Sequence, residues 1–291
     1  MAENKHIDPV TGTATTGHEW DGVRELNTPL PRWWLWIFYA TIVWSVGYWI
    51  VYPSWPLLTT ATEGVLGYHT RTAIVEDLNQ LKVLRGPMAQ KLAGSTVQQI
   101  AADPQLLVFA RAQGRVAFQD NCAPCHGAGG GGAKGYPNLN DDEWLWGGKL
   151  DDIHATLQHG IRAADKDTRS GSMPAFGRDK MLKPDEISSA ADFVRWLAAL
   201  PVPAHANLVG GKKVFADSCA VCHGEAGKGN RELGAPDLTD KIWLYGSDKE
   251  TIVAGIMSGR GSVMPAWGGR LDESTIKALT VYVHTLGGGE K

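Results

Sequence analysis

The chain has 291 residues, which is long enough for about two domains with additional segments. Its formal net charge of −3 excludes the strongly basic surface on which nucleic-acid binding depends, so we expect no nucleic-acid partner. Hydrophobic residues make up 43% of the chain, enough for buried cores, and seven of the 12 tryptophans lie between Trp20 and Trp55.

The first 32 residues are polar, with scattered Gly, Thr and Pro, and we expect them to form an extended tail. This tail carries Lys5, Arg24 and Arg32, whereas the 18 residues after Tyr52 contain no Lys or Arg. Because positive charge is retained on the inner side of a membrane, this asymmetry favours a cytoplasmic N-terminus.

Residues 33–52, WWLWIFYATIVWSVGYWIVY, contain no charged residue. A helix of this length spans about 30 Å, the hydrocarbon thickness of a bilayer. Aromatic residues gather at both ends, as they do at membrane interfaces, and Pro53 and Pro56 mark the exit. A core helix of a soluble protein is usually shorter, and a signal peptide has a shorter apolar run and a small-residue cleavage site. We therefore predict a single retained transmembrane helix.

Residues 53–110 are predicted to be a helical connector on the outer side of the membrane. Apolar residues first recur at helical spacing, at Ile74, Leu78, Leu81 and Leu84. Pro87 is expected to end this helix, and Ser95 and Gln98 occupy capping-box positions for a second, short helix. The connector is either a spacer or a surface for partner proteins, and the pattern does not distinguish these two roles.

From Gly114 onward the chain repeats itself. GRVAFQDNCAPCHG corresponds to GKKVFADSCAVCHG, GYPNLNDDEWLWGG to GAPDLTDKIWLYGS, and ISSAADFVRWL to IKALTVYVHTL. Such self-similarity indicates a duplicated domain, and we place the copies at 111–200 and 205–291 with a Pro-rich joint at about 198–208. Each copy is expected to be helical with a long Gly-rich loop, so the predicted fold class is mainly α.

All four cysteines lie in two Cys-x-x-Cys-His motifs, a pattern typical of covalent c-type haem attachment. The motifs are Cys122, Cys125 and His126 in the first copy, and Cys219, Cys222 and His223 in the second. A thioredoxin-like redox pair needs a βαβ setting, and two zinc knuckles normally lie much closer together. Structural disulfides would not require a histidine after each pair. We therefore predict two haem c groups, with the cysteines as attachment points and each histidine as an iron ligand.

The second iron ligand is predicted to be Met173 in the first copy and Met264 in the second, because both occupy the same position before a proline. Methionine is also a common core residue, and the matched position argues against that simpler interpretation. A thioether ligand raises the reduction potential relative to a second histidine. Competing residues are Met181, His154 and His159 near the first site and Met257 near the second, and the first copy carries an insertion, RAADKDTRS, just before its methionine.

A glycine and a phenylalanine also recur ahead of the cysteines in both copies. Gly114 and Phe118, like Gly211 and Phe215, precede the cysteines at intervals of four, which allows a second helix to cross closely. We expect that partner to be the terminal helix of the same copy. Its aromatic residues are Phe193 and Trp196 in the first copy and Tyr282 in the second.

Pro137 and Pro236 follow the two motif histidines, and a carbonyl there is expected to hold the histidine Nδ1–H. Trp144 and Trp243 are candidates for the apolar walls of the sites, although structural packing explains them equally well.

Each repeat resembles a class I cytochrome c domain, in the order Gly and Phe, Cys-x-x-Cys-His, Pro loop, Met and aromatic terminal helix. The N-terminal stretch HEWDGVRELNTPLPRWWLWIFYATIVWSVGYWIVYPSWP, followed by GVLGYHTR, resembles that of the dihaem subunits of cbb3-type cytochrome c oxidases, the FixP or CcoP family. The resemblance implies a subunit of the bacterial inner membrane with both haems in the periplasm.

The same resemblance implies electron transfer from a soluble or membrane cytochrome c donor. The electrons would pass, through a monohaem cytochrome c subunit, to the catalytic haem–copper subunit that reduces oxygen and pumps protons. Ligand pairs His126/Met173 and His223/Met264 would fill both axial positions of each iron. The chain itself would then have no catalytic residue, and the enzyme would be the whole oxidase. The alternatives are a cytochrome subunit of a periplasmic dehydrogenase, which the Trp-rich N-terminus does not favour, and a haem-based sensor, which needs an open iron position.

Overall fold

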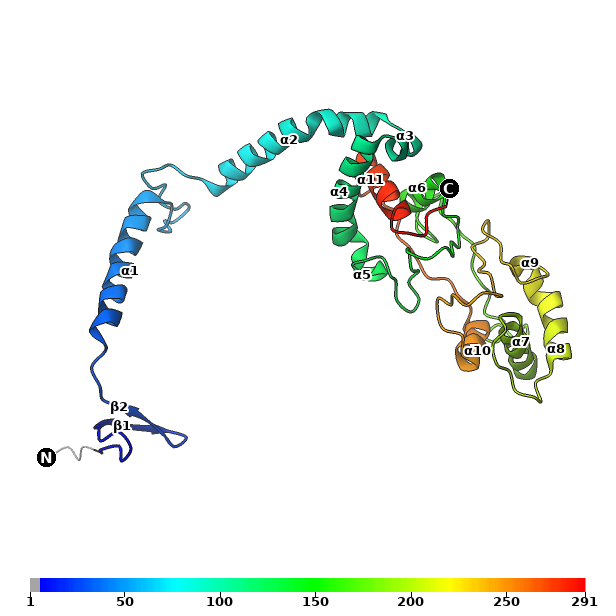
Figure 1. Cartoon of the computed structure of the whole chain (residues 1–291), viewed down its shortest axis with the longest axis horizontal. Helices are drawn as coiled ribbons and strands as arrows, with labels where there is room; N and C mark the ends of the chain where they lie inside the picture. Colours follow the sequence, from blue (N-terminus) through cyan, green and yellow to red (C-terminus); the bar gives the residue numbers. More distant parts are fainter. Residues whose placement is uncertain (1–5, 291) are drawn as a thin grey trace. The chain divides into compact units, whose positions relative to one another are not determined.

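The computed structural model describes residues 6–290. They form two units, and the boundary between them falls between Leu84 and Arg85. The first unit contains a β-hairpin and the long apolar helix, and the second contains both Cys-x-x-Cys-His motifs (Figure 1).

The N-terminal tail is not simply extended. Strands β1 (Thr15–Trp20) and β2 (Val23–Leu26) pair antiparallel, with Trp20 opposite Val23. The two residues between them, Asp21 and Gly22, have φ angles of 49° and 82°, as a two-residue hairpin turn with the twist of the strands requires. An Asp-Gly pair is the signal for this hairpin, and the sequence analysis did not use it.

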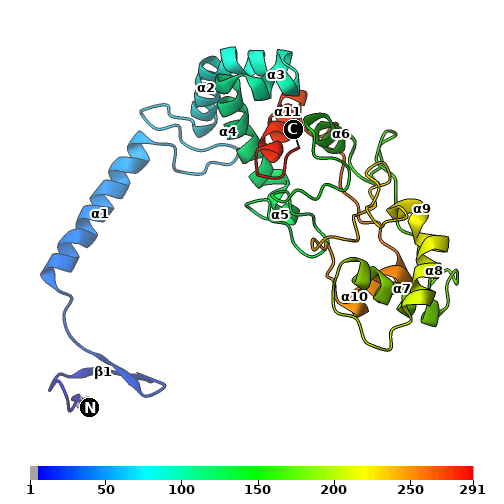
Figure 2. The ribbon, with the colours of Figure 1, turned by 45° about the vertical axis from the view of Figure 1, so that its right-hand side comes forward.

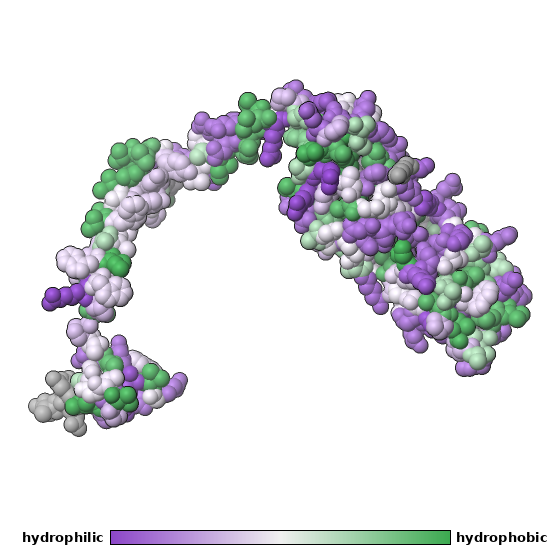
Figure 3. All heavy atoms as spheres, viewed as in Figure 1, coloured by the Kyte–Doolittle hydropathy of each residue, from purple (hydrophilic) through white to green (hydrophobic). Residues whose placement is uncertain are grey.

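Helix α1 (Arg32–Val51) confirms the predicted apolar helix to within one residue at each end. It has the length and composition of a membrane span, and none of its residues is buried within the structure. Pale and green atoms cover most of its surface in Figure 3, where charged side chains would be purple. A helix with so many exposed apolar side chains is not a core helix, which fits a membrane anchor.

Helix α2 (Thr70–Gly94) continues through Pro87, so the prediction that this proline ends the helix is wrong. A proline inside a helix removes one hydrogen bond and costs roughly 3 kcal/mol. The turns beyond it are held by tertiary contacts: Leu92 is fully buried, and Lys277 donates from Nζ to the Ala93 carbonyl at 2.9 Å. Burying a leucine contributes about 1.5–3 kcal/mol, so packing offsets the effect of the proline.

The capping box of helix α3 (Val97–Ala102) lies one residue later than predicted, at Thr96 and Gln99. Helix α4 (Pro104–Asn121) follows directly, with Asp103 as its N-cap. Their buried faces form one cluster with the end of α2 and with two residues of the last helix; its members are Leu92, Ile100, Leu106, Ala110, Ala278 and Val281. The last part of the connector is therefore a structural element of the second unit.

Eight further helical elements complete the described part of the second unit. They are α5 (Ala123–His126), α6 (Leu150–His159), α7 (Pro184–Leu197), α8 (Leu208–Val214), the π-helical turn η1 (Phe215–Cys219), α9 (Ala220–His223), α10 (Lys249–Ser258) and α11 (Glu273–His284), with loops between them.

The terminal helices of the two copies are exchanged. Helix α4 of the first copy packs on α11 of the second, and α7 packs on α8, as both Figure 1 and Figure 2 show. The close approach predicted at the glycines does occur, but to the terminal helix of the other copy. A Cβ on Gly114 would overlap the Ala278 carbonyl of α11, and a Cβ on Gly211 would overlap the Ser189 carbonyl of α7. The expectation that each first helix packs on the terminal helix of its own copy is wrong.

The aromatic contacts follow the same exchange. The ring of Phe118 lies 5.4 Å from that of Tyr282, and the ring of Phe193 lies 5.5 Å from that of Phe215. Because both first helices carry the same Gly and Phe pattern, that pattern alone does not decide which terminal helix packs on which first helix. Helices that follow one another along the chain with a short connection tend to pack together, and only residues 198–207 separate α7 from α8.

Candidate functional site

Each Cys-x-x-Cys-His motif forms a single helical turn at the end of a longer helix. The Cys122 N–H donates to the Phe118 carbonyl at 2.8 Å, so α4 continues into α5. Cys122 and Cys125 are three residues apart and therefore lie on one side of this turn. None of the four cysteines forms a disulfide. Burial raises the pKa of the Cys122 and Cys219 thiols to about 11, so both are protonated at neutral pH.

Both motif histidines are held by the carbonyl predicted for them. His126 Nδ1 lies 3.0 Å from the Pro137 oxygen, and His223 Nδ1 lies 3.1 Å from the Pro236 oxygen. Burial lowers the pKa of both imidazoles, so each ring is neutral, donates from Nδ1 and keeps its Nε2 lone pair. This is the orientation that a metal-binding imidazole requires.

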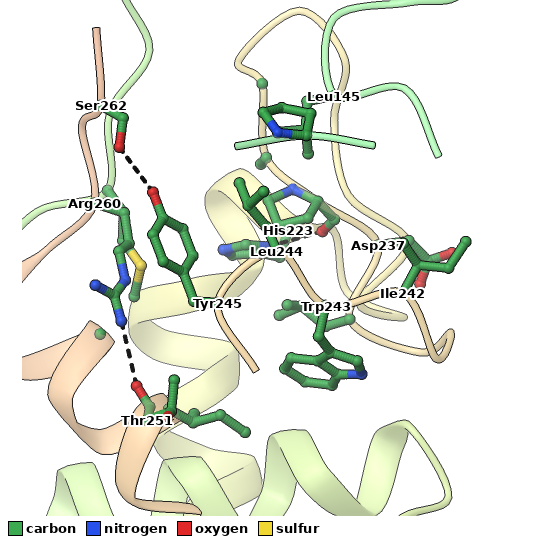
Figure 4. Close-up of a pocket in the computed structure, with 18 of the residues that line it drawn as sticks. Leu145, His223, Asp237, Ile242, Trp243, Leu244, Tyr245, Thr251, Arg260 and Ser262 are labelled. Carbon is green, nitrogen blue, oxygen red and sulfur yellow. Dashed lines mark hydrogen bonds between the residues drawn. The ribbon is translucent and has the colours of Figure 1, made fainter. Parts of the chain in front are cut away.

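The second motif opens into a cavity of about 800 Å³. Cys219, Cys222 and His223 line it together with Met173 and Trp243, and Figure 4 shows His223 and Trp243 on its wall. The volume is within the range of cofactor pockets, which run from roughly 300 to 1,000 Å³. A mostly apolar cavity with a neutral imidazole and a thioether fits a covalently held haem.

The first motif lies against the other methionine. Met264 packs on the buried cluster that contains Cys122 and Phe118, together with Ile153 and Leu157 of α6. Met173 instead packs on the cluster around Phe176, Ile187 and Ile256. The expected pairs His126/Met173 and His223/Met264 therefore do not match the structure, because each methionine lies beside the motif of the other copy.

Two short backbone bridges mark where the copies cross. Met173 and Arg260 exchange both of their N–H···O bonds, at 2.9 and 3.1 Å, and Ile161 and Met264 do the same at 3.0 Å. The two Met-Pro loops thus run side by side with the ends of α6 and α10. These bridges fix which methionine enters which site.

The competing ligands are engaged elsewhere. Met181 is exposed, and Met257 packs in the core against Phe176 and Ile187. His154 Nε2 lies 3.2 Å from Glu273, and His159 Nδ1 lies 3.0 Å from Asp165, a residue of the insertion in the first copy. None of these four lines the cavity of the second motif.

An arginine that was not among the predicted site residues also lies at the second site. Arg260 lines the cavity, and its guanidinium lies 4.1 Å from the centre of the Tyr245 ring, whose hydroxyl is 2.9 Å from Ser262 Oγ (Figure 4). Its Nη2 donates to the Thr251 carbonyl at 3.4 Å, so most of its N–H groups remain available. A cavity-lining cation is suited to the carboxylate side chains of a haem.

Arg169 repeats this arrangement in the first copy. Its guanidinium lies 5.5 Å from the Trp146 ring, and its Nη2 donates to the Asp152 carbonyl at 3.1 Å. Its Nε is buried without a hydrogen-bond partner. Each arginine precedes the methionine of its copy by four residues, and this matched spacing is the signal that would have identified both.

The two candidate wall tryptophans differ. Trp144 donates from Nε1 to the Gly288 carbonyl at 2.6 Å and packs on the cluster of the first motif. Trp243 lines the cavity of the second motif, and its Nε1 is buried without a partner. The wall role therefore fits Trp243 better than Trp144.

Comparison with known proteins identifies related families along the whole chain. Residues 12–59 match the family described as the N-terminal domain of cytochrome oxidase-cbb3, FixP; residues 111–198 match cytochrome c; and residues 206–283 match cytochrome C oxidase, cbb3-type, subunit III. The chain is 55% identical over its full length to the cbb3-type cytochrome c oxidase subunit FixP of Bradyrhizobium sp. (strain ORS 278), of which it covers 100%.

Two further relatives are similar over nearly their whole length. The FixP subunit of Azorhizobium caulinodans is 58% identical, with 98% of this chain and 96% of the relative aligned. The CcoP subunit of Azospirillum brasilense is 50% identical, with 98% of this chain and 99% of the relative aligned. The similarity therefore includes the N-terminal segment as well as both repeats.

Proposed function

The chain belongs to the FixP/CcoP family, the electron-transfer subunits of cbb3-type cytochrome c oxidases. From this membership we propose that it carries two covalent haem c groups, and from the positions of Met173 and Met264 we propose that their ligands are crossed. Cys122 and Cys125 attach the first haem, whose iron has His126 and Met264 as ligands. Cys219 and Cys222 attach the second, whose iron has His223 and Met173. The observation that carries this proposal is the presence of Met173 in the cavity of His223.

The residues of the chain hold the cofactor and do no bond chemistry on a substrate. Pro137 and Pro236 orient the two imidazoles through Nδ1, and the backbone bridges hold the two thioethers in place. When bound, each haem iron accepts and releases one electron. With a histidine and a methionine on the two faces no position stays open for a substrate, which supports relay of electrons rather than sensing or catalysis within this chain.

Partners and membrane sidedness follow from the same family. We propose an N-terminus in the cytoplasm and both haems in the periplasm of a bacterial inner membrane, supported by the basic residues that precede α1 and their absence just after it. Electrons then come from a soluble or membrane cytochrome c. They pass, through a monohaem subunit, to the catalytic haem–copper subunit. The match of residues 12–59 to FixP favours this partner over a periplasmic dehydrogenase.

Crossed ligation is tested with protein that holds one haem at a time. In a Cys219→Ala/Cys222→Ala background only the first haem is attached, and Met264→Leu is then expected to remove the iron–thioether absorption band and lower the reduction potential. Met173→Leu in the same background is the matched control and should leave both unchanged. The reciprocal background, Cys122→Ala/Cys125→Ala, should respond to Met173→Leu alone.

If the first haem responded to Met173→Leu and the second to Met264→Leu, the crossed ligation would be overturned. The proposal that the chain carries two haem c groups would not be affected. If a double cysteine variant does not accumulate, the two methionine variants are compared in the intact chain, with the potentials of the two haems resolved by titration. The function itself is tested on the complex purified through this chain: b-type haem that binds carbon monoxide, together with oxygen uptake, is expected to copurify.

A further inference from the structure

The segment that follows α1 forms a small hairpin that is closed by hydrogen bonds within the segment. Pro56 and Ala61 form an antiparallel bridge, and the Leu57 N–H donates to the Thr60 carbonyl at 2.7 Å. Thr62 closes the base: its N–H donates to the Trp55 carbonyl at 2.9 Å, and its Oγ1 accepts from the Trp55 N–H at 3.1 Å. Residues 53–62 are called the post-membrane hairpin below.

This hairpin and the turn after it are tied to the end of α1. The N–H groups of Val65 and Leu66 donate to the carbonyls of Ile50 and Val51, at 2.9 and 3.1 Å. The Trp55 ring lies 4.8 Å from that of Trp49, in the last turn of α1. The base of the post-membrane hairpin is therefore at the level at which the apolar helix ends.

The tip of the hairpin presents aliphatic side chains to the outside. Leu58 is fully exposed, at 105% of its reference area, and Leu57 is 59% exposed. No Lys or Arg occurs between Arg32 and Arg71, and Glu63 is the one acidic residue in 53–68. Two adjacent exposed leucines in a nearly uncharged segment indicate an interaction surface, because the exposure of apolar side chains to water is unfavourable.

We propose that the post-membrane hairpin inserts Leu57 and Leu58 into the lipid leaflet on the side of the haem domains. Leu58 is the third residue after Trp55, so the tip lies within about 10 Å of Trp55, whose ring packs on the last turn of α1. The polar layer on each side of a bilayer is only roughly 5–8 Å thick, so the boundary with the acyl chains is within reach of the tip.

The order of side chains along the hairpin favours lipid over a protein partner. Aromatic rings lie at its base, where Trp49 contacts Trp55 and Tyr52 contacts Tyr68 at 5.8 Å, and aliphatic side chains lie at its tip. That is the order in which a surface enters a bilayer. The inference rests on α1 as the membrane span and does not depend on how the haems are ligated.

The experiment places a nitroxide spin label at Leu58→Cys in the assembled, haem-loaded oxidase reconstituted in phosphatidylcholine/phosphatidylglycerol nanodiscs. Collision rates with oxygen, which partitions into lipid, and with a water-soluble nickel chelate are measured. Val43→Cys, exposed in the middle of α1, is the lipid reference, and Val209→Cys, exposed on α8, is the water reference. The native cysteines do not interfere when they are bound to haem, and unlabelled wild type checks this directly.

The ratio of oxygen to nickel collisions at position 58 is expected to be nearer to that at position 43 than to that at position 209. A ratio equal to that at position 209 would show a hairpin in water and overturn the proposal. A strongly immobilised label with low collision rates for both reagents would show contact with another subunit, which also overturns it. A failure of the ligand assignment would leave all of these readings unchanged, so the two proposals can fail separately.

Discussion

The two Cys-x-x-Cys-His halves share a pattern but are supported differently. In the first half α4 is 18 residues long, and α3 and the end of α2 cover it together with α11. In the second half α8 has seven residues and passes through the π-helical turn η1 before the motif. Both Phe118 and Phe215 are nevertheless almost completely buried. The same site can thus be built on a long helix with added layers or on a short one.

The difference is clearest at one pair of equivalent positions. Val281 on α11 is fully buried in the cluster formed with the connector helices. Its counterpart on α7 is Asp192, which is also buried and pairs with Lys249 at 2.7 Å. Where the first half has a hydrophobic layer, the second half has one ion pair. The connector is therefore more than a spacer for the first half, and the second half has no equivalent of it among the described residues.

The largest expected effect follows from that ion pair. Lys249→Met leaves the Asp192 carboxylate buried, with one oxygen already unpartnered, and we expect a loss of about 3–5 kcal/mol of unfolding free energy. Thermal unfolding of the haem-loaded chain measures it. The double variant Asp192→Val/Lys249→Leu, which copies Val281 and Leu150 of the first half, is expected to recover most of the loss. Lys213→Met, which breaks the exposed pair with Asp217, is the control and should change little.

The next effect tests whether the two helix crossings are equally tight. Gly114→Ala and Gly211→Ala each place a methyl group against a backbone carbonyl of the exchanged helix, and each is expected to cost about 1–3 kcal/mol. Gly86→Ala in α2 is the matched control, because that position has open space and alanine favours a helix. Denaturant midpoints measure all three. Stability unchanged by Gly114→Ala would contradict the packing of α4 on α11.

A smaller effect separates the two arginines. Loss of a positive charge stabilises the oxidised iron, so Arg260→Gln is expected to lower the potential of the second haem and Arg169→Gln that of the first. We expect a few tens of millivolts, up to roughly the 59 mV that corresponds to a tenfold change for one electron. Arg270→Gln, which removes an exposed arginine 5.5 Å from the Trp267 ring, is the control. Potentiometric titration that shows both variants acting on one haem would contradict the assignment.

The smallest effect concerns a carboxyl group between the halves. Burial, and then repulsion from Asp240, raises the pKa of Glu143, whose equivalent position in the second copy is the uncharged Ile242. Because the folded-state pKa is raised, stability is highest below the ordinary pKa of Glu and falls as the pH rises through the raised value. Glu143→Gln should therefore stabilise the fold by a few tenths of a kcal/mol at neutral pH, since the group is partly solvated.

Unfolding at neutral and acidic pH measures this change. The gain from Glu143→Gln should disappear at acidic pH, where the native carboxyl group is protonated in both states. A gain that is equal at both pH values would show that charge is not its cause.

Local patterns predicted what needs only neighbouring residues. The haem-attachment motifs, the two Met-Pro positions, the carbonyls that hold His126 and His223, and the apolar helix all depend on short spacings or on composition, and the structure has each of them in its expected local form. The hairpin at Asp21 and Gly22 was also readable, but its signal was not used.

Tertiary structure decided the rest. Pro87 remains inside a helix because Leu92 is buried beyond it, and no local rule contains that contact. Met173 and Met264 are chemically equivalent in sequence, and so are the two Gly and Phe pairs. Which methionine meets which histidine therefore depends on how the chain crosses at Ile161 and Arg260, and on the short joint that brings α7 to α8. A duplicated sequence determines the parts of each site, but its two equal copies leave their pairing to the connections between them.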